Sequence, residues 1–290
     1  DREHVDHYGD FDRLCEAFVD FASRVPFHGA VVACADDPVV ARLLPRMTRR
    51  VVPYGFAAPA AAVCGVDVEV TAAGSRCRVE QAGAASGARA LGEIRLKVPG
   101  RHNLANALAA VAVGVELGMA FETIAAALAE FPGAERRFQV IGEAGGVRVV
   151  DDYGHHPTEI AAVLDAARLG PLRRLVVAFE PHRFSRTAAL LPEFGRALAA
   201  ADEVVVAPIY PAGEDPIPGI TAEAVAGAVR AVRPVPVHVV AALDEVVPCV
   251  ADLAREGDLV ITLGAGSIGT VAPQILEALR RRAARPEAAR

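Results

Sequence analysis

The stretch Leu175-Val176-Val177-Ala178-Phe179 is a short apolar run that leads directly into the polar segment Glu180-Pro181-His182-Arg183-Phe184-Ser185-Arg186-Thr187. A continuously apolar run, rather than an alternating one, is typical of a strand whose two faces are both covered in a parallel sheet. In an open parallel sheet, ligands bind beyond the carboxyl ends of the strands, where this polar segment would lie. The stretch therefore predicts a buried parallel strand with candidate site residues at its end.

Similar apolar runs recur through the second half of the chain, and segments with helical spacing separate them. The predicted strands are residues 147–150, 175–179, 203–207, 235–240 and 259–263, and the predicted helices are residues 158–168, 188–200, 221–232, 243–255 and 268–282. Strands that alternate with helices in this way indicate βαβ units. We therefore predict an α/β domain with a parallel sheet from about residue 142 onward.

The first half has a different organisation. Its predicted elements are a helix over 11–25, a buried strand over 30–35, a small antiparallel patch over 66–70, 75–81 and 93–98, and helices over 103–118 and 122–131. The segment Pro132-Gly133-Ala134-Glu135 breaks the helical pattern and is the best candidate for a linker. The sequence thus predicts an α/β protein of two domains, residues 1–135 and 136–290. The length of 290 residues agrees with two domains at about 150 residues each.

The composition argues against several classes of protein. The 30 basic and 36 acidic residues give a net charge of −6, which argues against nucleic acid as the main partner. The longest apolar stretch, residues 104–121, is interrupted by Asn106 and Glu116, so it predicts a buried helix and not a membrane span. Five scattered cysteines without CxxC spacing indicate free thiols in a reducing cytosol and no zinc site. We expect a soluble, cytoplasmic protein with no membrane partner.

The sequence supports neither of two common nucleotide-binding loops. A P-loop ends in Gly-Lys-[Ser/Thr], but Lys97, the only lysine, lies in Leu96-Lys97-Val98-Pro99. The segment Gly264-Ala265-Gly266-Ser267-Ile268-Gly269 fits the G-x-G-x-x-G pattern, yet a dinucleotide fingerprint also needs an acidic residue on a further strand about 20 residues on. Because only one predicted helix follows, a tight turn or an anion-binding helix start is favoured over NAD binding.

Polar residues follow four of the predicted strands of the second half, in segments 151–159, 180–187, 210–215 and 264–269. Because the carboxyl ends of parallel strands share one edge of a sheet, we expect a functional crevice there. Three of the histidines and two of the arginines, which are His155, His156, His182, Arg183 and Arg186, would lie at this edge.

Structural roles stay open for these residues beside the functional ones. Asp151 can serve as a helix cap, and Tyr153 and His155 can be packing residues. Arg183 and Arg186 are three positions apart, so on a helical turn they share a face and can clamp one carboxylate. Ordinary surface ion pairs are the alternative for these two arginines.

The first half offers two further groups of polar residues. His4 and His7 are three positions apart; magnesium prefers oxygen ligands, so a histidine would be a minority ligand of that ion. Asn103 and Asn106 place two amides three positions apart at a helix start, which suits the edge of a purine. Asn103 can instead be an N-cap, whereas Asn106 inside an apolar helix needs a partner.

The segment Arg136-Arg137-Phe138 lies at the predicted linker, where a cation between domains could clamp a phosphate.

Five segments, in this order, resemble the Mur ligases, and the resemblance spans essentially the whole chain. They are His4-Val5-Asp6-His7-Tyr8-Gly9-Asp10, Gly100-Arg101-His102-Asn103 with Asn106, Arg136-Arg137-Phe138, Asp152-Tyr153-Gly154-His155-His156-Pro157 and Pro181-His182-Arg183-Phe184-Ser185-Arg186-Thr187. Each segment alone is a weak signal, but five in order are a strong one, and the last two match the family nearly word for word.

The resemblance implies an ATP-dependent amide ligase of peptidoglycan precursor synthesis, here as a truncated central ATPase-type α/β domain followed by a Rossmann-like C-terminal domain. The implied substrates are UDP-N-acetylmuramate and L-alanine, the cofactors ATP and Mg2+, and the intermediate an acyl phosphate. The implied catalytic residues are Arg137, His155 and His182; Tyr153, Arg183 and Arg186 would bind substrate; His102, Asn103, Asn106, Arg137 and Asp152 would bind ATP; and His4 would bind the metal.

Within ATP, the resemblance assigns adenine to His102, Asn103 and Asn106, the γ-phosphate to Arg137, and the ribose to Asp152 with Tyr153. It assigns alanine and the reacting carboxylate to His155, His182, Arg183 and Arg186.

The sequence departs from the family pattern in one respect above all. The family has a UDP-binding domain, a P-loop and a magnesium-binding Glu ahead of the segment at His4, and the 290 residues hold none of them. We therefore expect a fragment that is inactive alone. Glu180 also occupies a position where Gln is common in the family.

The alternative functions are a non-catalytic Mur-ligase-like binding module, the relative that recycles a tripeptide, and an NAD-dependent oxidoreductase that would depend on residues 264–269 alone. The oligomeric state is left open.

Overall fold

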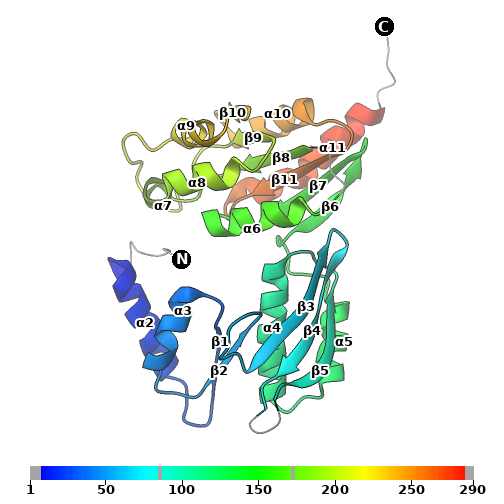
Figure 1. The fold of residues 1–290 in the computed structure, drawn as a ribbon. Helices are drawn as coiled ribbons and strands as arrows, with labels where there is room; N and C mark the ends of the chain where they lie inside the picture. Colours follow the sequence, from blue (N-terminus) through cyan, green and yellow to red (C-terminus); the bar gives the residue numbers. More distant parts are fainter. Residues whose placement is uncertain (1–7, 84–86, 171–173, 285–290) are drawn as a thin grey trace, which may run out of the picture. The chain divides into compact units, whose positions relative to one another are not determined.

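The computed structural model of the chain describes residues 8–83, 87–170 and 174–284 (Figure 1). The chain divides into two compact units, Asp1–Pro132 and Gly133–Arg290. This division falls within the Pro132–Glu135 segment that the sequence indicates as a linker. Each unit is built around one sheet, and the two sheets differ in how they are covered.

The first unit contains a five-stranded sheet in the order β1-β2-β3-β4-β5. Strands β1 to β3 pair in parallel, and β3 to β5 form an antiparallel meander. The strands are β1 (Val31–Cys34), β2 (Val51–Gly55), β3 (Val63–Thr71), β4 (Gly74–Gln81) and β5 (Arg89–Leu96), and the helices are α2 (Phe11–Ser23), α3 (Pro38–Leu43), η1 (Leu44–Arg46), α4 (Arg101–Glu116) and α5 (Phe121–Glu130). The strand β2 and the helix α3 were not predicted from the sequence.

The meander of the first unit buries one face and leaves the other to charged side chains. Along β4, Cys77 and Val79 are buried and pack in a core with Leu108 of α4 and Ile124 of α5. Arg76 and Arg78 alternate with these residues and point to the other face, where they form ion pairs with acidic side chains of the meander. This alternation is what an antiparallel sheet with one solvated face requires.

The second unit contains a six-stranded sheet in the order β10-β9-β8-β11-β7-β6, in which β6 alone is antiparallel to its neighbour. The strands are β6 (Gln139–Ala144), β7 (Val147–Asp152), β8 (Arg174–Phe179), β9 (Glu203–Val206), β10 (Val237–Val239) and β11 (Asp258–Leu263). The connecting helices are α6 (Pro157–Ala167), α7 (Phe184–Ala189), α8 (Leu191–Leu198), α9 (Ala222–Val232), η2 (Leu243–Glu245), α10 (Val246–Leu253), η3 (Ser267–Thr270) and α11 (Val271–Ala284).

Both faces of the second sheet are covered. On β8, Val177 and Phe179 pack with residues of α6, α8 and α9, whereas Val176 and Ala178 pack with residues of α10 and α11. The central strand β11 is buried along its whole length. The predicted α/β class and parallel sheet are therefore confirmed, because continuous apolar strands need helices on both sides.

Two details of the second unit differ from the prediction. The edge strand β6 was not predicted, since it contains Gly142 and its residues are exposed or half-buried instead of continuously apolar. The helix predicted over 188–200 is broken at Leu190, because Pro192 in the first turn of α8 has no N–H with which to continue α7. In the described part of the chain, no helix is both long and apolar enough to span a membrane.

Candidate functional site

Four aromatic rings from three loops meet at the carboxyl edge of the second sheet. Tyr153 and His155 follow β7, and their ring centroids are 5.4 Å apart. His155 lies 5.8 Å from His182, which follows β8, and His182 stacks on Tyr210 at 5.2 Å with an interplanar angle of 12°. The structure thus brings Tyr153, His155 and His182 together, as the sequence analysis predicted, and adds Tyr210 to them.

His182 is held from several sides. The N–H of Tyr210 donates to Pro181 and the N–H of Arg183 donates to Tyr210, both at 2.8 Å, so the segments after β8 and β9 are joined at this point. Nη1 of Arg186 lies 3.2 Å from Nδ1 of His182. Burial, followed by the charge of Arg186 and of His155, lowers the pKa of His182 to about 4. The imidazole is therefore neutral at physiological pH.

Arg183 and Arg186 do not share one helical face. Arg183 precedes α7 with a φ of 74°, whereas Arg186 lies on α7. The guanidinium of Arg183 is 3.5 Å from the carboxylate of Glu214, which also accepts hydrogen bonds from the N–H and the hydroxyl of Ser185. Although burial opposes its ionisation, these bonds and the Arg183 charge lower the pKa of Glu214. The two arginines are oriented by different partners, Glu214 and His182.

Asp152 lies inside the fold, with 2% of its surface exposed. Its carboxylate accepts the N–H of Phe138 and the N–H of Gly154, each at 2.7 Å. Burial raises the pKa of Asp152 against the effect of these two bonds. Asp152 therefore fixes the loop that carries Tyr153, and its contact with a ribose stays a prediction.

His155 is oriented by contacts of its ring nitrogen Nδ1. Its Nδ1 lies 3.1 Å from the carbonyl oxygen of Tyr153 and 3.5 Å from the Glu159 carboxylate. Glu159 also accepts the backbone N–H of His155 at 3.0 Å. Although burial opposes it, the hydrogen bond from His155 and nearby positive charge lower the pKa of Glu159.

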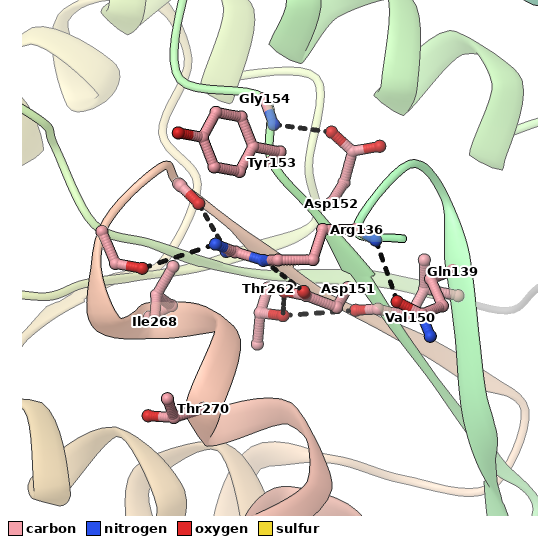
Figure 2. Close-up of polar contacts among 12 residues, drawn as sticks. Arg136, Gln139, Val150, Asp151, Asp152, Tyr153, Gly154, Thr262, Ile268 and Thr270 are labelled. Carbon is pink, nitrogen blue, oxygen red and sulfur yellow. Dashed lines mark hydrogen bonds and ion pairs between the residues drawn. The ribbon is translucent and has the colours of Figure 1, made fainter. Parts of the chain in front are cut away.

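Arg136, which the sequence analysis passed over in favour of Arg137, anchors the centre of this edge (Figure 2). Its guanidinium donates to Asp151 at 2.8 Å and to the carbonyl oxygen of Gly264 at 2.6 Å, and it lies 5.0 Å from the Tyr153 ring centre. Asp151 also accepts the Thr262 hydroxyl at 2.5 Å. One signal in the sequence could have identified Arg136. Asp151 directly follows a predicted buried strand, and a buried carboxylate needs a positively charged partner. The Asp151 cap interpretation is wrong.

Arg137 has a different position. Its side chain is exposed, lies 3.4 Å from Glu159, and is 5.8 Å from the Tyr153 ring centre. It is thus near the ring cluster and accessible, as its predicted contact with a γ-phosphate would require.

The G-x-G-x-x-G segment is a turn bound by the chain's own side chains. Gly264 has a φ of 148°, and its carbonyl oxygen is a partner of Arg136. The N–H of Ile268 donates to the carboxylate of Glu180 at 3.0 Å. Burial raises the pKa of Glu180. The tight-turn interpretation is supported, and the anion at the helix start is Glu180 itself.

The candidate adenine contacts of the first unit lie at the start of α4. The helix begins at Arg101 with Gly100 as its N-cap, so the N-cap interpretation of Asn103 is wrong. The Asn103 amide instead donates to the carbonyl oxygen of Pro99 at 2.7 Å. Asn106 is exposed, so water can hydrogen-bond its amide, while His102 and Asn103 are half-buried. An exposed Asn106 is compatible with a ligand contact.

The predicted metal ligand His4 lies outside the described residues, and so does His7. Among residues 8–83, 87–170 and 174–284, no group of three or more His, Cys, Asp or Glu side chains is placed to hold a metal ion.

Comparison with known proteins gives a consistent result for both units. Residues 1–114 match the Mur ligase middle domain, and residues 136–266 match the glutamate ligase domain of Mur ligases. The UDP-N-acetylmuramate–L-alanine ligase of Solibacter usitatus is 47% identical over 280 residues, which cover 97% of this chain and 58% of that protein.

Solved structures agree with the sequence matches. The UDP-N-acetylmuramate–alanine ligase of Thermotoga maritima superposes with a TM-score of 0.73 at 26% identity, covering 97% of this chain and 58% of that one. The MurF ligase of the same organism, solved in complex with ADP, has a TM-score of 0.72 at 20% identity and covers 97% of this chain and 61% of its own, which shows a shared fold. The chain spans about three-fifths of the length of the relatives that it matches.

Proposed function

The chain belongs to the Mur ligase family, and from that premise we propose that it carries the nucleotide-binding and amino-acid-binding residues of a cytoplasmic UDP-N-acetylmuramate–L-alanine ligase. The observation that carries the proposal is the ring and arginine cluster at the carboxyl edge of the second sheet. Its composition suits a small carboxylate, because arginine and imidazole N–H groups form charge-assisted hydrogen bonds with carboxylate oxygens.

The proposed reaction has two steps. The lactyl carboxylate oxygen attacks the γ-phosphorus of ATP, an O–P bond forms, and ADP leaves with the electron pair of the broken bond. The amine nitrogen of L-alanine then attacks the acyl carbon, the C–N bond forms, and inorganic phosphate leaves as the nitrogen loses its proton. Both steps concentrate negative charge on oxygen atoms, which positioned cations stabilise.

We assign roles by the resemblance to the Mur ligases. His102, Asn103 and Asn106 would contact adenine, the exposed Arg137 would reach the γ-phosphate, and Asp152 with Tyr153 would form the ribose side. His155, His182, Arg183 and Arg186 would hold L-alanine and the reacting carboxylate. Magnesium belongs to this proposal through the resemblance of the segment at His4, but no step is assigned to it, because His4 lies outside the described residues.

The direct test measures ADP release with ATP, magnesium, UDP-N-acetylmuramate and L-alanine. It compares this chain with a P-loop-extended version, which carries the UDP-binding domain and the P-loop segment of a Mur ligase ahead of Asp1. We expect activity only in the extended version, because the 290 residues contain no P-loop to hold the phosphates. If both proteins are folded and neither releases ADP in the presence of L-alanine, a non-catalytic binding module is favoured instead. Release that requires a tripeptide in place of L-alanine would indicate the recycling relative.

A further inference from the structure

The contact between Arg186 and His182 determines where the imidazole carries its hydrogen. Nη1 of Arg186 lies 3.2 Å from Nδ1 of His182 and 3.1 Å from the carbonyl oxygen of the same residue. A guanidinium only donates hydrogen bonds, and Nη1 has two hydrogens, one for each of these acceptors. Nδ1 must therefore present its lone pair, and a neutral imidazole with that lone pair has its hydrogen on Nε2.

We propose that Arg186 holds His182 as the neutral Nε2–H tautomer, so that His182 donates a hydrogen bond from Nε2 to an oxygen of a bound carboxylate. In this role His182 transfers no proton and carries no charge, and Arg186 is a positioning residue for it. The identity of the carboxylate rests on the proposed function, whereas the tautomer follows from the contacts of this chain alone.

The surroundings of His182 oppose the alternative, a charged imidazolium. The groups that face it are Arg186, His155, Arg183 and Glu214, of which only Glu214 favours the cation. The tyrosine ring of Tyr210 stacks on the imidazole and is fixed by backbone bonds on both sides of the contact. A second positive charge beside Arg186 would meet Coulomb repulsion in a partly buried place. Burial and these charges agree with the lowered pKa of His182.

His155 provides an internal contrast. The carbonyl oxygen of Tyr153 lies 3.1 Å from Nδ1 of His155, and a carbonyl oxygen only accepts. The Glu159 carboxylate lies on the same side, 3.5 Å away. Nδ1 of His155 therefore carries a hydrogen, and its neutral form has the lone pair on Nε2. Two rings 5.8 Å apart are thus held in opposite tautomers by their own neighbours.

Long-range proton–nitrogen NMR on this 290-residue chain, labelled with nitrogen-15 histidine, tests the tautomers directly. His182→Gln and His155→Gln spectra assign the two sets of signals. We expect His182 to show a protonated Nε2 and an unprotonated Nδ1 at every pH from 8 down to about 5.5, and His155 to show a protonated Nδ1. An imidazolium signal for His182 at pH 6, or a hydrogen on its Nδ1, overturns the proposal.

A pair of arginine variants tests the part played by Arg186. In Arg186→Ala, we expect the pKa of His182 to rise and both neutral tautomers to appear. The matched control is Arg196→Ala, since Arg196 lies on the neighbouring helix α8 and pairs with the exposed Glu193. The control should leave the His182 signals unchanged. An Arg186→Ala spectrum with unaltered His182 signals contradicts the positioning role.

Activity of the P-loop-extended protein tests the donor role. A glutamine amide can place its N–H near the position of Nε2, so His182→Gln should retain most activity, while His182→Ala should lose about 10- to 100-fold in kcat/KM. A loss confined to the KM of L-alanine identifies the amino-acid carboxylate, and one confined to UDP-N-acetylmuramate identifies the lactyl carboxylate. Equal losses in both variants overturn the donor role. No activity in the unsubstituted protein would contradict the proposed function, while NMR would still decide the tautomer.

Discussion

The two sheets of the molecule differ in how many of their faces are buried by helices. In the first unit the antiparallel meander buries one face against α4 and α5 and exposes a ladder of ion pairs on the other. In the second unit the parallel strands are apolar throughout, and helices cover both faces. A sheet covered on both faces has only its edges left for polar side chains, so its candidate site residues gather at the carboxyl edge. The described candidates of the first unit, His102, Asn103 and Asn106, instead lie within two turns of one helix.

The largest effect should come from the doubly covered core. Phe194 of α8 is fully buried, with its ring centroid 5.4 Å from that of Phe179. Phe194→Ala should reduce the free energy of unfolding of the second unit by about 4 kcal/mol, because a large cavity is left in a close-packed interior. Hydrogen exchange measured in denaturant resolves the two units. The unfolding free energy of the first unit is the control and should stay unchanged. Ile94 is buried in the first unit, so Ile94→Ala should lower the unfolding free energy of that unit and leave the second unit unchanged. If Phe194→Ala lowers the unfolding free energy of the second unit by less than about 1 kcal/mol, the close packing on both faces of its sheet is contradicted.

The next effect concerns the polar anchor of the carboxyl edge. Arg136→Ala removes the counter-charge of Asp151, whose side chain is 3% exposed, and should cost about 3 kcal/mol of unfolding free energy in the second unit. Arg137→Ala is the matched control. Arg137 is exposed, so its replacement should leave the denaturation midpoint unchanged within error. Equal midpoints for the two variants would show that Arg136 does not anchor the edge.

A smaller effect should appear in the pH dependence of stability. The pKa of His182 is about 4 in the folded chain and about 6.5 when unfolded, so the unfolded state takes up a proton first as the pH falls. His182 therefore removes stability from the second unit between about pH 6.5 and pH 4, and has no further effect below that range. Comparison with His182→Gln isolates this contribution, which we expect to be about 1–2 kcal/mol because the ring is only partly buried. Parallel pH profiles for the two proteins would refute it.

The sequence predicted the second unit better than the first for a physical reason. Continuous apolar runs followed by polar segments define both the strands and the shared edge, so the meeting of Tyr153, His155 and His182 could be expected from chain order. Tyr210 and Glu214 lay in a segment that the pattern placed at the edge, but their stacking and ion pair depend on side-chain geometry.

Other features left weaker signals. The edge strand β6 and the short strand β2 have mixed, half-exposed patterns that do not show a clear period. Arg136 and Arg137 are adjacent and of one type, so only the structure could show that the first is an internal anchor and the second is accessible. The N-cap assignment of Asn103 failed because a glycine with a φ of 112° starts the helix instead.

The kinetics of Arg186→Ala in the P-loop-extended protein test whether the carboxyl edge of the second sheet binds the carboxylate substrates. For L-alanine or UDP-N-acetylmuramate, we expect kcat/KM to fall by the equivalent of about 1.5–3 kcal/mol of transition-state stabilisation, with the KM of ATP unchanged, because a charge-assisted contact and the His182 donor are both disturbed. Arg196→Ala should behave as the unsubstituted protein. Unchanged constants for both L-alanine and UDP-N-acetylmuramate in Arg186→Ala would show that this edge does not bind the carboxylate substrates.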